Sequence, residues 1–163
     1  MKNSILTGIV LALALSSAPA LAQDGRQGNA GSFALGLQLG GANGPNGTSG
    51  FSGLTARFGR EKTIEGILAF NDGGTWIVNG NFLVHGGNLF HQNPIDAIKL
   101  YAGFGLGAWT GGDGGFWAQV PLGVDIAFAI PIEASVYVAP GLDLLPSASG
   151  NVHFGLGVRY WFT

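Results

Sequence analysis

Hydrophobic and polar positions alternate most regularly at the C-terminal end of the chain, over residues 151–163. The even positions of this segment carry the apolar side chains Val152, Phe154, Leu156, Val158, Tyr160 and Phe162. The odd positions carry His153, Gly155, Gly157, Arg159 and Trp161. Because successive side chains of a β-strand point to opposite faces, the pattern predicts a strand with one continuous apolar face. That face would be buried in a soluble sandwich and would contact lipid in an outer-membrane barrel.

The same alternation recurs in seven preceding segments, at residues 33–40, 54–58, 64–70, 76–84, 99–107, 116–128 and 132–138. Connections rich in Gly, Asn and Asp separate them, because these residues tolerate turn geometry. We expect loops at 41–50, 110–115 and 140–150, a hairpin turn at 71–74, very short turns at 59–61 and 129–131, and an irregular linker at 86–96. The pattern predicts an all-β fold, a single eight-stranded antiparallel up-and-down transmembrane β-barrel over residues 33–163.

The N-terminal residues predict export rather than a part of the barrel. Lys2 supplies a positive charge, residues 5–15 form a short apolar core, and Ala20-Leu21-Ala22 resembles a cleavage site for a secretory signal peptide. We therefore expect residues 1–22 to be a signal peptide. Residues 23–32 are polar and rich in glycine, and we expect them to form a flexible lead-in to the barrel.

Composition supports a membrane barrel and argues against several other classes. Hydrophobic residues make up 47% of the chain and charged residues 10%, against about 25% charged residues in typical soluble domains. After residue 22 there is no apolar run of the roughly 20 residues that a membrane helix needs. The formal net charge of −2 gives no basic patch, so nucleic acid is not an expected partner. The absence of cysteine excludes disulfides and thiolate metal sites.

Three segments carry a resemblance to the small OmpA/OmpX-type outer-membrane barrels. They are the sixth strand (Q-V-P-L-G-V-D-I-A-F), the Ile130-Pro131 turn and the terminal G-L-G-V-R-Y-W-F, although Thr163 follows the aromatic residue at which such strands usually stop. The resemblance implies a protein of the outer membrane of a Gram-negative bacterium, with periplasmic chain ends and a role in envelope structure or surface interaction. It also implies contact with outer-membrane lipid and with the barrel assembly machinery through the C-terminal strand, no cofactor, and an unknown extracellular partner at the loops.

Aromatic residues on the apolar faces are expected to form two girdles at the lipid interfaces. The outer girdle would contain Phe51, Phe70, Trp76, Phe116 and Phe154. The inner girdle would contain Phe33, Phe58, Phe128, Tyr160 and Phe162. A soluble barrel could place aromatic residues anywhere on its buried face, so this distribution favours a membrane protein.

Six charged residues lie within the expected strands, and all six share the face opposite the apolar one. They are Arg57, Glu65, Lys99, Asp125, Glu133 and Arg159. An unpaired charge in a narrow lumen would cost several kcal/mol, on the order of 5, so these groups should pair with one another. Because barrels of about eight strands are generally filled by side chains, a salt-bridged plug is favoured over an ion pathway or a catalytic cluster.

Two other functions remain open from the sequence. A soluble periplasmic barrel could bind a hydrophobic ligand inside, but its apolar faces would have to point inward. A lipid-modifying outer-membrane enzyme would need a His, a Ser and an acidic residue meeting at the outer rim, and His153 has no serine beside it. The three histidines, His85, His91 and His153, show no metal-binding spacing, so no metal site is expected. We predict a protein that is not an enzyme.

Overall fold

The computed structural model describes residues 33–163 except 45–46, 72, 112–113 and 163, and these residues form an all-β fold. The expected signal peptide and lead-in lie outside the described residues. The strands are β1 (Phe33–Gly44), β2 (Gly47–Phe58), β3 (Lys62–Asn71), β4 (Trp76–Gln92), β5 (Ile95–Thr110), β6 (Gly115–Gln119), β7 (Leu122–Phe128), β8 (Ile132–Leu145) and β9 (Ser149–Phe162). No helix among the described residues is long and apolar enough to cross a membrane.

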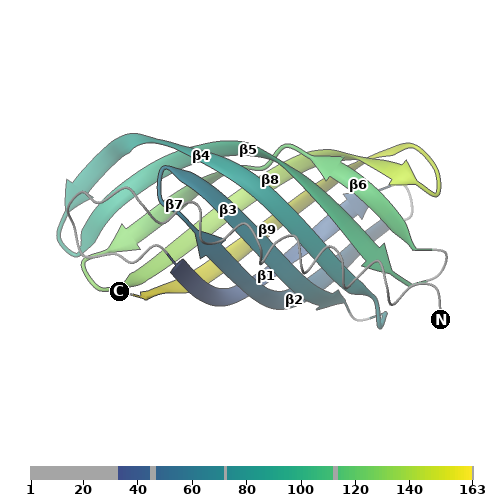
Figure 1. The fold of residues 1–163 in the computed structure, drawn as a ribbon, viewed down its shortest axis with the longest axis horizontal. Coiled ribbons are helices and arrows are strands. Elements are labelled where there is room, and N and C mark those ends of the chain that lie inside the picture. The colour runs from purple at the N-terminus through teal and green to yellow at the C-terminus, as the bar shows by residue number, and fades with distance from the viewer. Residues whose placement is uncertain (1–32, 45–46, 72, 112–113, 163) are drawn as a thin grey trace.

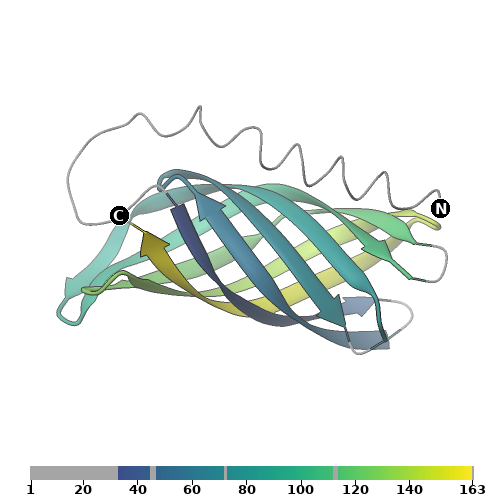
Figure 2. The same cartoon turned by 60° about the horizontal axis from the view of Figure 1, so that its bottom comes forward.

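Hydrogen bonds between the first and last strands close the sheet into a barrel. Strand β1 pairs with its neighbour β2 and also with β9, with Phe33 opposite Phe162 and Asn43 opposite Val152. All pairings are antiparallel, and each strand follows its sequence neighbour around the wall (Figures 1 and 2). Closure leaves no edge strand with unpaired backbone groups, which is the condition for a sheet in hydrocarbon. The predicted antiparallel barrel is confirmed.

The sixth passage of the chain across the barrel is interrupted. Strands β6 and β7 both lie between β5 and β8, and they are separated only by Val120 and Pro121. Proline has no backbone N–H, so it cannot donate to a strand ladder. The neighbouring backbone groups stay satisfied, because Gly103 N–H donates to the Pro121 carbonyl and Val120 N–H donates to the Pro140 carbonyl. The nine strands therefore make eight passages.

Three segments that were expected to be loops are largely strand. Strands β1 and β2 continue to Gly44 and from Gly47, and β8 and β9 continue to Leu145 and from Ser149, so the predictions of loops at 41–50 and 140–150 are wrong. The linker at 86–96 is also wrong, because β4 and β5 stay paired, with irregular register, up to the pair Gln92–Ile95. This hairpin projects beyond the wall at the end that holds the C-terminus (Figure 1). Glycine-rich segments stay extended here because a neighbouring strand pairs with them.

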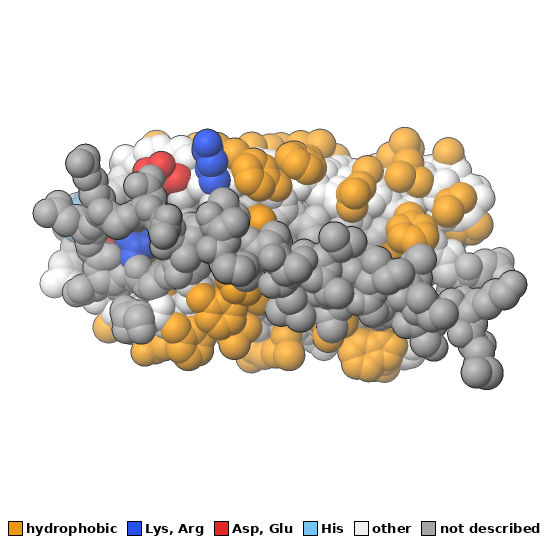
Figure 3. Space-filling model, in the orientation of Figure 1, with side chains coloured by type: hydrophobic (Ala, Val, Ile, Leu, Met, Phe, Trp, Pro, Cys, Tyr) orange, Lys and Arg blue, Asp and Glu red, His pale blue; other side chains and the backbone are white. Residues whose placement is uncertain are grey.

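The apolar faces of the strands point outward. Leu37, Phe104 and Leu106 are 65%, 63% and 63% exposed. Apolar side chains cover both long sides of the molecule in Figure 3, and the Lys, Arg, Asp and Glu visible there gather near one end. The soluble alternative required these faces to line the interior, so the structure contradicts it.

Large side chains fill the lumen, and each lies against a glycine of a neighbouring strand. A Cβ atom added to Gly107 would lie 2.0 Å from the Trp117 ring, and one added to Gly123 would lie 2.4 Å from the Tyr101 ring. Gly155 has the same relation to Tyr137, at 2.5 Å. The glycines that alternate with apolar residues therefore leave room for large lumen residues.

Candidate functional site

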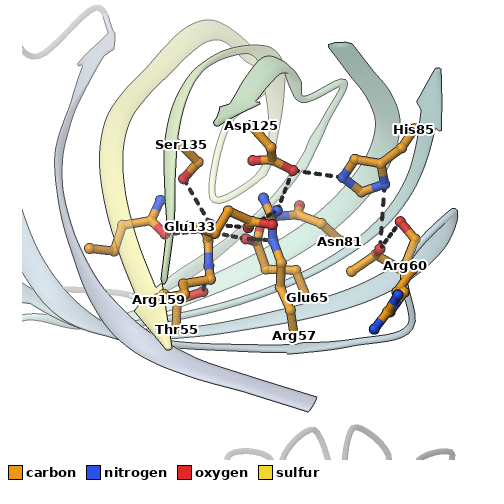
Figure 4. A network of polar contacts seen from close by, with 12 residues as sticks. Thr55, Arg57, Arg60, Glu65, Asn81, His85, Asp125, Glu133, Ser135 and Arg159 are labelled. Atoms are coloured by element: carbon orange, nitrogen blue, oxygen red, sulfur yellow. Dashed lines mark hydrogen bonds and ion pairs between the residues drawn. The ribbon is translucent and has the colours of Figure 1, made fainter. Parts of the chain in front are cut away.

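Arg57 is the centre of a group of buried charges in the lumen, which we name the ion-pair network (Figure 4). It comprises Arg57, Glu65, Asp125, Glu133, Arg159 and His85. Arg57 Nε donates to Glu65 at 2.8 Å, and its NH1 atom donates to Asp125 at 2.5 Å and to Glu133 at 2.9 Å. The side chain is 1% exposed. Its bonds join β2 to β3, β7 and β8, so they cross the lumen.

Arg159 on β9 is the second buried cation of the network. Its NH2 atom donates to Glu65 at 2.6 Å, and its NH1 atom donates to Ser135 at 2.8 Å and lies 3.4 Å from Glu133. The side chain lies against Gly36 of β1, where an added Cβ would be 2.7 Å from Arg159 Cγ. Two guanidinium groups therefore share the same carboxylates, which satisfies charges that would be costly to bury alone.

Further polar side chains bond to the three carboxylates, although the Oδ1 atom of Asp125 has no hydrogen-bond partner among the described residues. Asn81 donates to Glu65 at 2.9 Å, and Trp161 Nε1 donates to Glu133 at 3.2 Å. His85 Nε2 lies 2.7 Å from Asp125, and its Nδ1 atom lies 3.4 Å from the Thr63 hydroxyl. These bonds add β4 to the strands that the ion-pair network connects. The ion-pair network therefore connects strands on opposite sides of the lumen at this level.

The ion-pair network differs from the expected set of six charges in one member. Lys99 shares the face of Tyr101 and is the register partner of Asp125, but no bond joins it to the other charges among the described residues. Its side chain is only partly buried, so the ammonium group can remain hydrated at the mouth. His85, which was not among the expected charges, is the sixth member of the ion-pair network instead of Lys99. Sequence reasoning missed His85, although it shares the parity of Asn79 and Asn81 on the same strand.

Phe51 corrects the expected outer girdle. It is 9% exposed and packs in the lumen with Ile67 and Ala69, over Gly40. Its position has the same parity as Thr55 and Arg57, which point inward, so alternation alone indicated this placement. The aromatic side chain type had suggested the lipid face.

The other nine aromatic residues of the expected girdles lie on the outward-facing parity of their strands. At the end where β1 begins and β9 ends, the ring centroid of Phe33 lies 4.8 Å from that of Phe58 and 5.7 Å from that of Phe162. At the opposite end, Phe70 and Trp76 are in edge contact at 5.3 Å. The remaining positions are Phe116, Phe128, Phe154 and Tyr160.

A cavity of about 440 Å³ occupies the lumen at the end of the barrel away from Phe33 and Phe162. We name it the outer cup. Its lining includes Trp109, Trp117, Asp143, Asn151 and His153. The Trp117 ring stacks on His153 at 5.0 Å and lies 5.7 Å from the Trp109 ring. Side chains leave this part of the lumen unfilled.

His153 and Asp143 line the outer cup, and Ser149 bonds to Asp143 beside it, so the residue types that the enzyme alternative required lie close together. Ser149 Oγ donates to Asp143 at 3.0 Å, but no hydrogen bond joins Ser149 to His153 among the described residues. A serine nucleophile needs a base within hydrogen-bonding reach. Here the Ser149 hydroxyl bonds to the Asp143 carboxylate rather than to a histidine. Nor do the described residues contain a group of three His, Cys, Asp or Glu side chains that could hold a metal ion.

Comparison with known proteins identifies a similar fold. No protein-family model matches the chain, and no curated protein matches its sequence. The crystal structure of Neisserial surface protein A superposes with a TM-score of 0.55, over 83% of this chain and 100% of that chain, at 13% sequence identity. At this identity the likeness concerns the fold alone. This chain has the architecture of a small antiparallel β-barrel like that of Neisserial surface protein A.

Proposed function

We propose that this chain is a non-enzymatic outer-membrane β-barrel protein of a Gram-negative bacterium. It would serve envelope structure or surface interaction, with a lumen closed to solute passage. The similarity to a barrel whose name describes a surface protein agrees with this role. Membership of the OmpA/OmpX-type superfamily belongs to the same proposal and rests on the residues of the sixth passage, the Ile130-Pro131 turn and the last strand.

The observation that carries the proposal is the inversion of the usual distribution of polarity. Leucine, valine and phenylalanine side chains cover the outside, while two arginines and three carboxylates are buried inside. Monomeric soluble proteins rarely expose contiguous apolar patches larger than a few hundred Å². Strands of about 10 tilted residues cross the apolar layer of an outer membrane, and the shortest uninterrupted passage, β3, has 10 residues. Lipid is therefore the proposed environment of the outer surface.

The aromatic pairs support a position in the bilayer. Phe33, Phe58 and Phe162 would lie at the periplasmic interface, beside the chain ends, and Phe70 and Trp76 would lie at the outer interface. The connections at 59–61 and 129–131 are very short, as is usual for periplasmic turns. In this orientation the outer cup opens to the exterior.

The ion-pair network supports a closed lumen. Its bonds run from Arg57 to carboxylates on the opposite wall, and Leu83, Tyr101, Tyr137 and Ala139 form a buried cluster in the lumen. Passage of a solute would require several charge-assisted hydrogen bonds to break together. We propose that the protein acts through its outer surface rather than as a channel.

Two measurements on the same cells test this proposal. The protein should be recovered in the outer-membrane fraction, and its mobility on a detergent gel should shift when the sample is boiled, because a closed barrel resists unfolding by detergent alone. Its mature N-terminus should be Gln23 if residues 1–22 are removed on export. A protein found free in the periplasm without detergent, or one without a heat-dependent shift, contradicts the proposal. A chain truncated before β9 is the control, because it cannot close and should show no shift.

The partners follow from the same proposal. The apolar outer face would contact outer-membrane lipid, and β9 would contact the barrel assembly machinery, because closure of the barrel requires this strand to pair with β1. A partner at the cell surface would meet the ends of β1 and β2, of β3 and β4, of β5 and β6, and of β8 and β9 at the side of the barrel that holds the outer cup.

A further inference from the structure

The outer cup has the size and position of a small-molecule site. Its volume of about 440 Å³ lies within the roughly 300–1,000 Å³ of such sites. The lining residues come from strands around the barrel, including β2, β4, β5, β6, β8 and β9. The cup is thus a concave, largely preformed site, built by strands rather than by loops.

Two tryptophans form the aromatic wall of the cup. Trp117 is 2% exposed and is fixed by a hydrogen bond from its Nε1 atom to Gln119 at 2.8 Å. Trp109 is only partly buried and lies over Gly115, where an added Cβ would be 2.1 Å from the ring. The stack of His153 on Trp117 supports this wall from the neighbouring strands. Trp109 is therefore the ring that is free to contact a ligand in the cup.

A carboxylate lies beside the aromatic wall. Asp143 is the register partner of Trp117 across β6 and β8. Ser149 and Asn151 both donate to its oxygens, which fixes the orientation of the carboxylate. The Oδ1 atom of Asn151 is buried without a donor among the described residues, and its partial negative charge adds to that of Asp143.

No positive charge offsets this carboxylate within the described lining. The lining contains neither Lys nor Arg. Among the described residues, the basic side chains outside the ion-pair network are Arg60, Lys62 and Lys99, and they belong to the inner ends of β3 and β5 or to the turn before β3. The cup thus has a negative potential that disfavours anions and favours cations.

We propose that the outer cup binds a small organic cation, with its ammonium group beside Asp143 and its apolar surface on the face of Trp109. Tryptophan attracts a cation over its ring face, and the attraction is stronger where water is excluded. The adjacent carboxylate adds a Coulombic contribution that a neutral ligand does not receive. This inference goes beyond the proposed function, because it depends on the closed barrel and the cup rather than on the membrane in which the barrel sits.

Choline and its uncharged isostere 3,3-dimethylbutan-1-ol separate charge recognition from simple apolar contact. The mature protein, folded in neutral detergent micelles, is titrated with each compound by calorimetry, and glucose is the third probe. We expect choline to bind at least about tenfold more tightly than the isostere, since a desolvated cation–π contact and a carboxylate both act on the charge. Glucose should not bind measurably.

The Asp143→Asn variant removes the charge and keeps a side chain that can bond to Ser149. It should weaken choline binding about tenfold without weakening that of the isostere, while the gel shift on boiling stays unchanged and reports an intact barrel. The Trp76→Phe variant, on the outer face, should bind choline as the parent protein does. Equal affinity for choline and the isostere, binding of glucose in preference to choline, or no heat signal up to about 10 mM choline would overturn the proposal.

Discussion

The two halves of the lumen are filled in opposite ways, although the same closed wall builds both. Around Arg57, two guanidinium groups and three carboxylates bind one another across the full width of the barrel. In the outer cup, by contrast, Trp109, Trp117 and His153 stack along one wall and leave a cavity of about 440 Å³. The half with the ion-pair network connects opposite walls of the barrel by hydrogen bonds. The half with the outer cup lines an open cavity with side chains.

This difference indicates that the ion-pair network contributes mainly to stability and the outer cup mainly to ligand binding. Removing one partner from a buried charge network leaves other charges uncompensated, which is strongly destabilising. Side chains that line a cavity have fewer contacts, so their removal costs less. We therefore expect stability to depend on the inner half of the lumen and ligand binding to depend on the outer half.

The largest effect should come from Arg57→Met, which keeps much of the side chain's length and removes the guanidinium. Three carboxylates then lose their shared partner inside the barrel, and the expected loss of unfolding free energy is about 3–5 kcal/mol. Urea unfolding in lipid vesicles measures it. Lys99→Met is the matched control, because Lys99 makes no bond to the network, and its effect should stay within about 0.5 kcal/mol. Equal losses in the two variants would contradict the assignment of the network.

A smaller effect is expected from Gly36→Ala. The new Cβ would lie 2.0 Å from the Val158 carbonyl oxygen and 2.7 Å from Arg159 Cγ, so β1 and β9 would have to separate locally. The loss should be about 1–3 kcal/mol, as for other overpacked sites. Gly66→Ala is the control, because no heavy atom lies within 4 Å of its added Cβ. The same urea titration compares the two, and a control as unstable as Gly36→Ala would show that loss of glycine, rather than the contact, matters.

The smallest effect is expected in the outer cup, from His153→Ala. Its ring contacts Trp117 at 5.0 Å, and ring contacts of this kind are worth about 0.5–1.5 kcal/mol. Unfolding in the vesicles used for Arg57→Met should therefore show a loss of about 1 kcal/mol. The exposed His91→Ala serves as reference. A loss as large as that of Arg57→Met would mean that the cup, too, is a structural part of the barrel.

The sequence predicted the faces of most strands correctly, because alternation is a local property with a period of two residues. Leu54 and Arg57 on β2, and Leu156 and Arg159 on β9, point to the sides that their parity indicates. The number of passages followed from the same pattern. Phe51 was wrongly predicted to face lipid, because its aromatic type was given more weight than the parity of its position.

The ends of the strands could not be read from the sequence. Residues 41–50 and 140–150 are rich in Gly, Pro, Asn and Ser, a composition typical of loops. In the structure their backbone groups pair with neighbouring strands, as Asp143 does with Ser149. Pairing depends on the partner strand, and a single segment carries no information about it.

The sequence by itself determined that this chain forms a closed antiparallel barrel with an apolar outside and a polar inside. Only the tertiary structure decided which charges meet, because Arg57 reaches Asp125 and Glu133 across 68 and 76 residues of chain. It also decided that His85 rather than Lys99 joins the ion-pair network, and that an unfilled cup remains above it. The physical reason is that parity is fixed residue by residue, whereas contacts across a lumen depend on the register around the whole barrel.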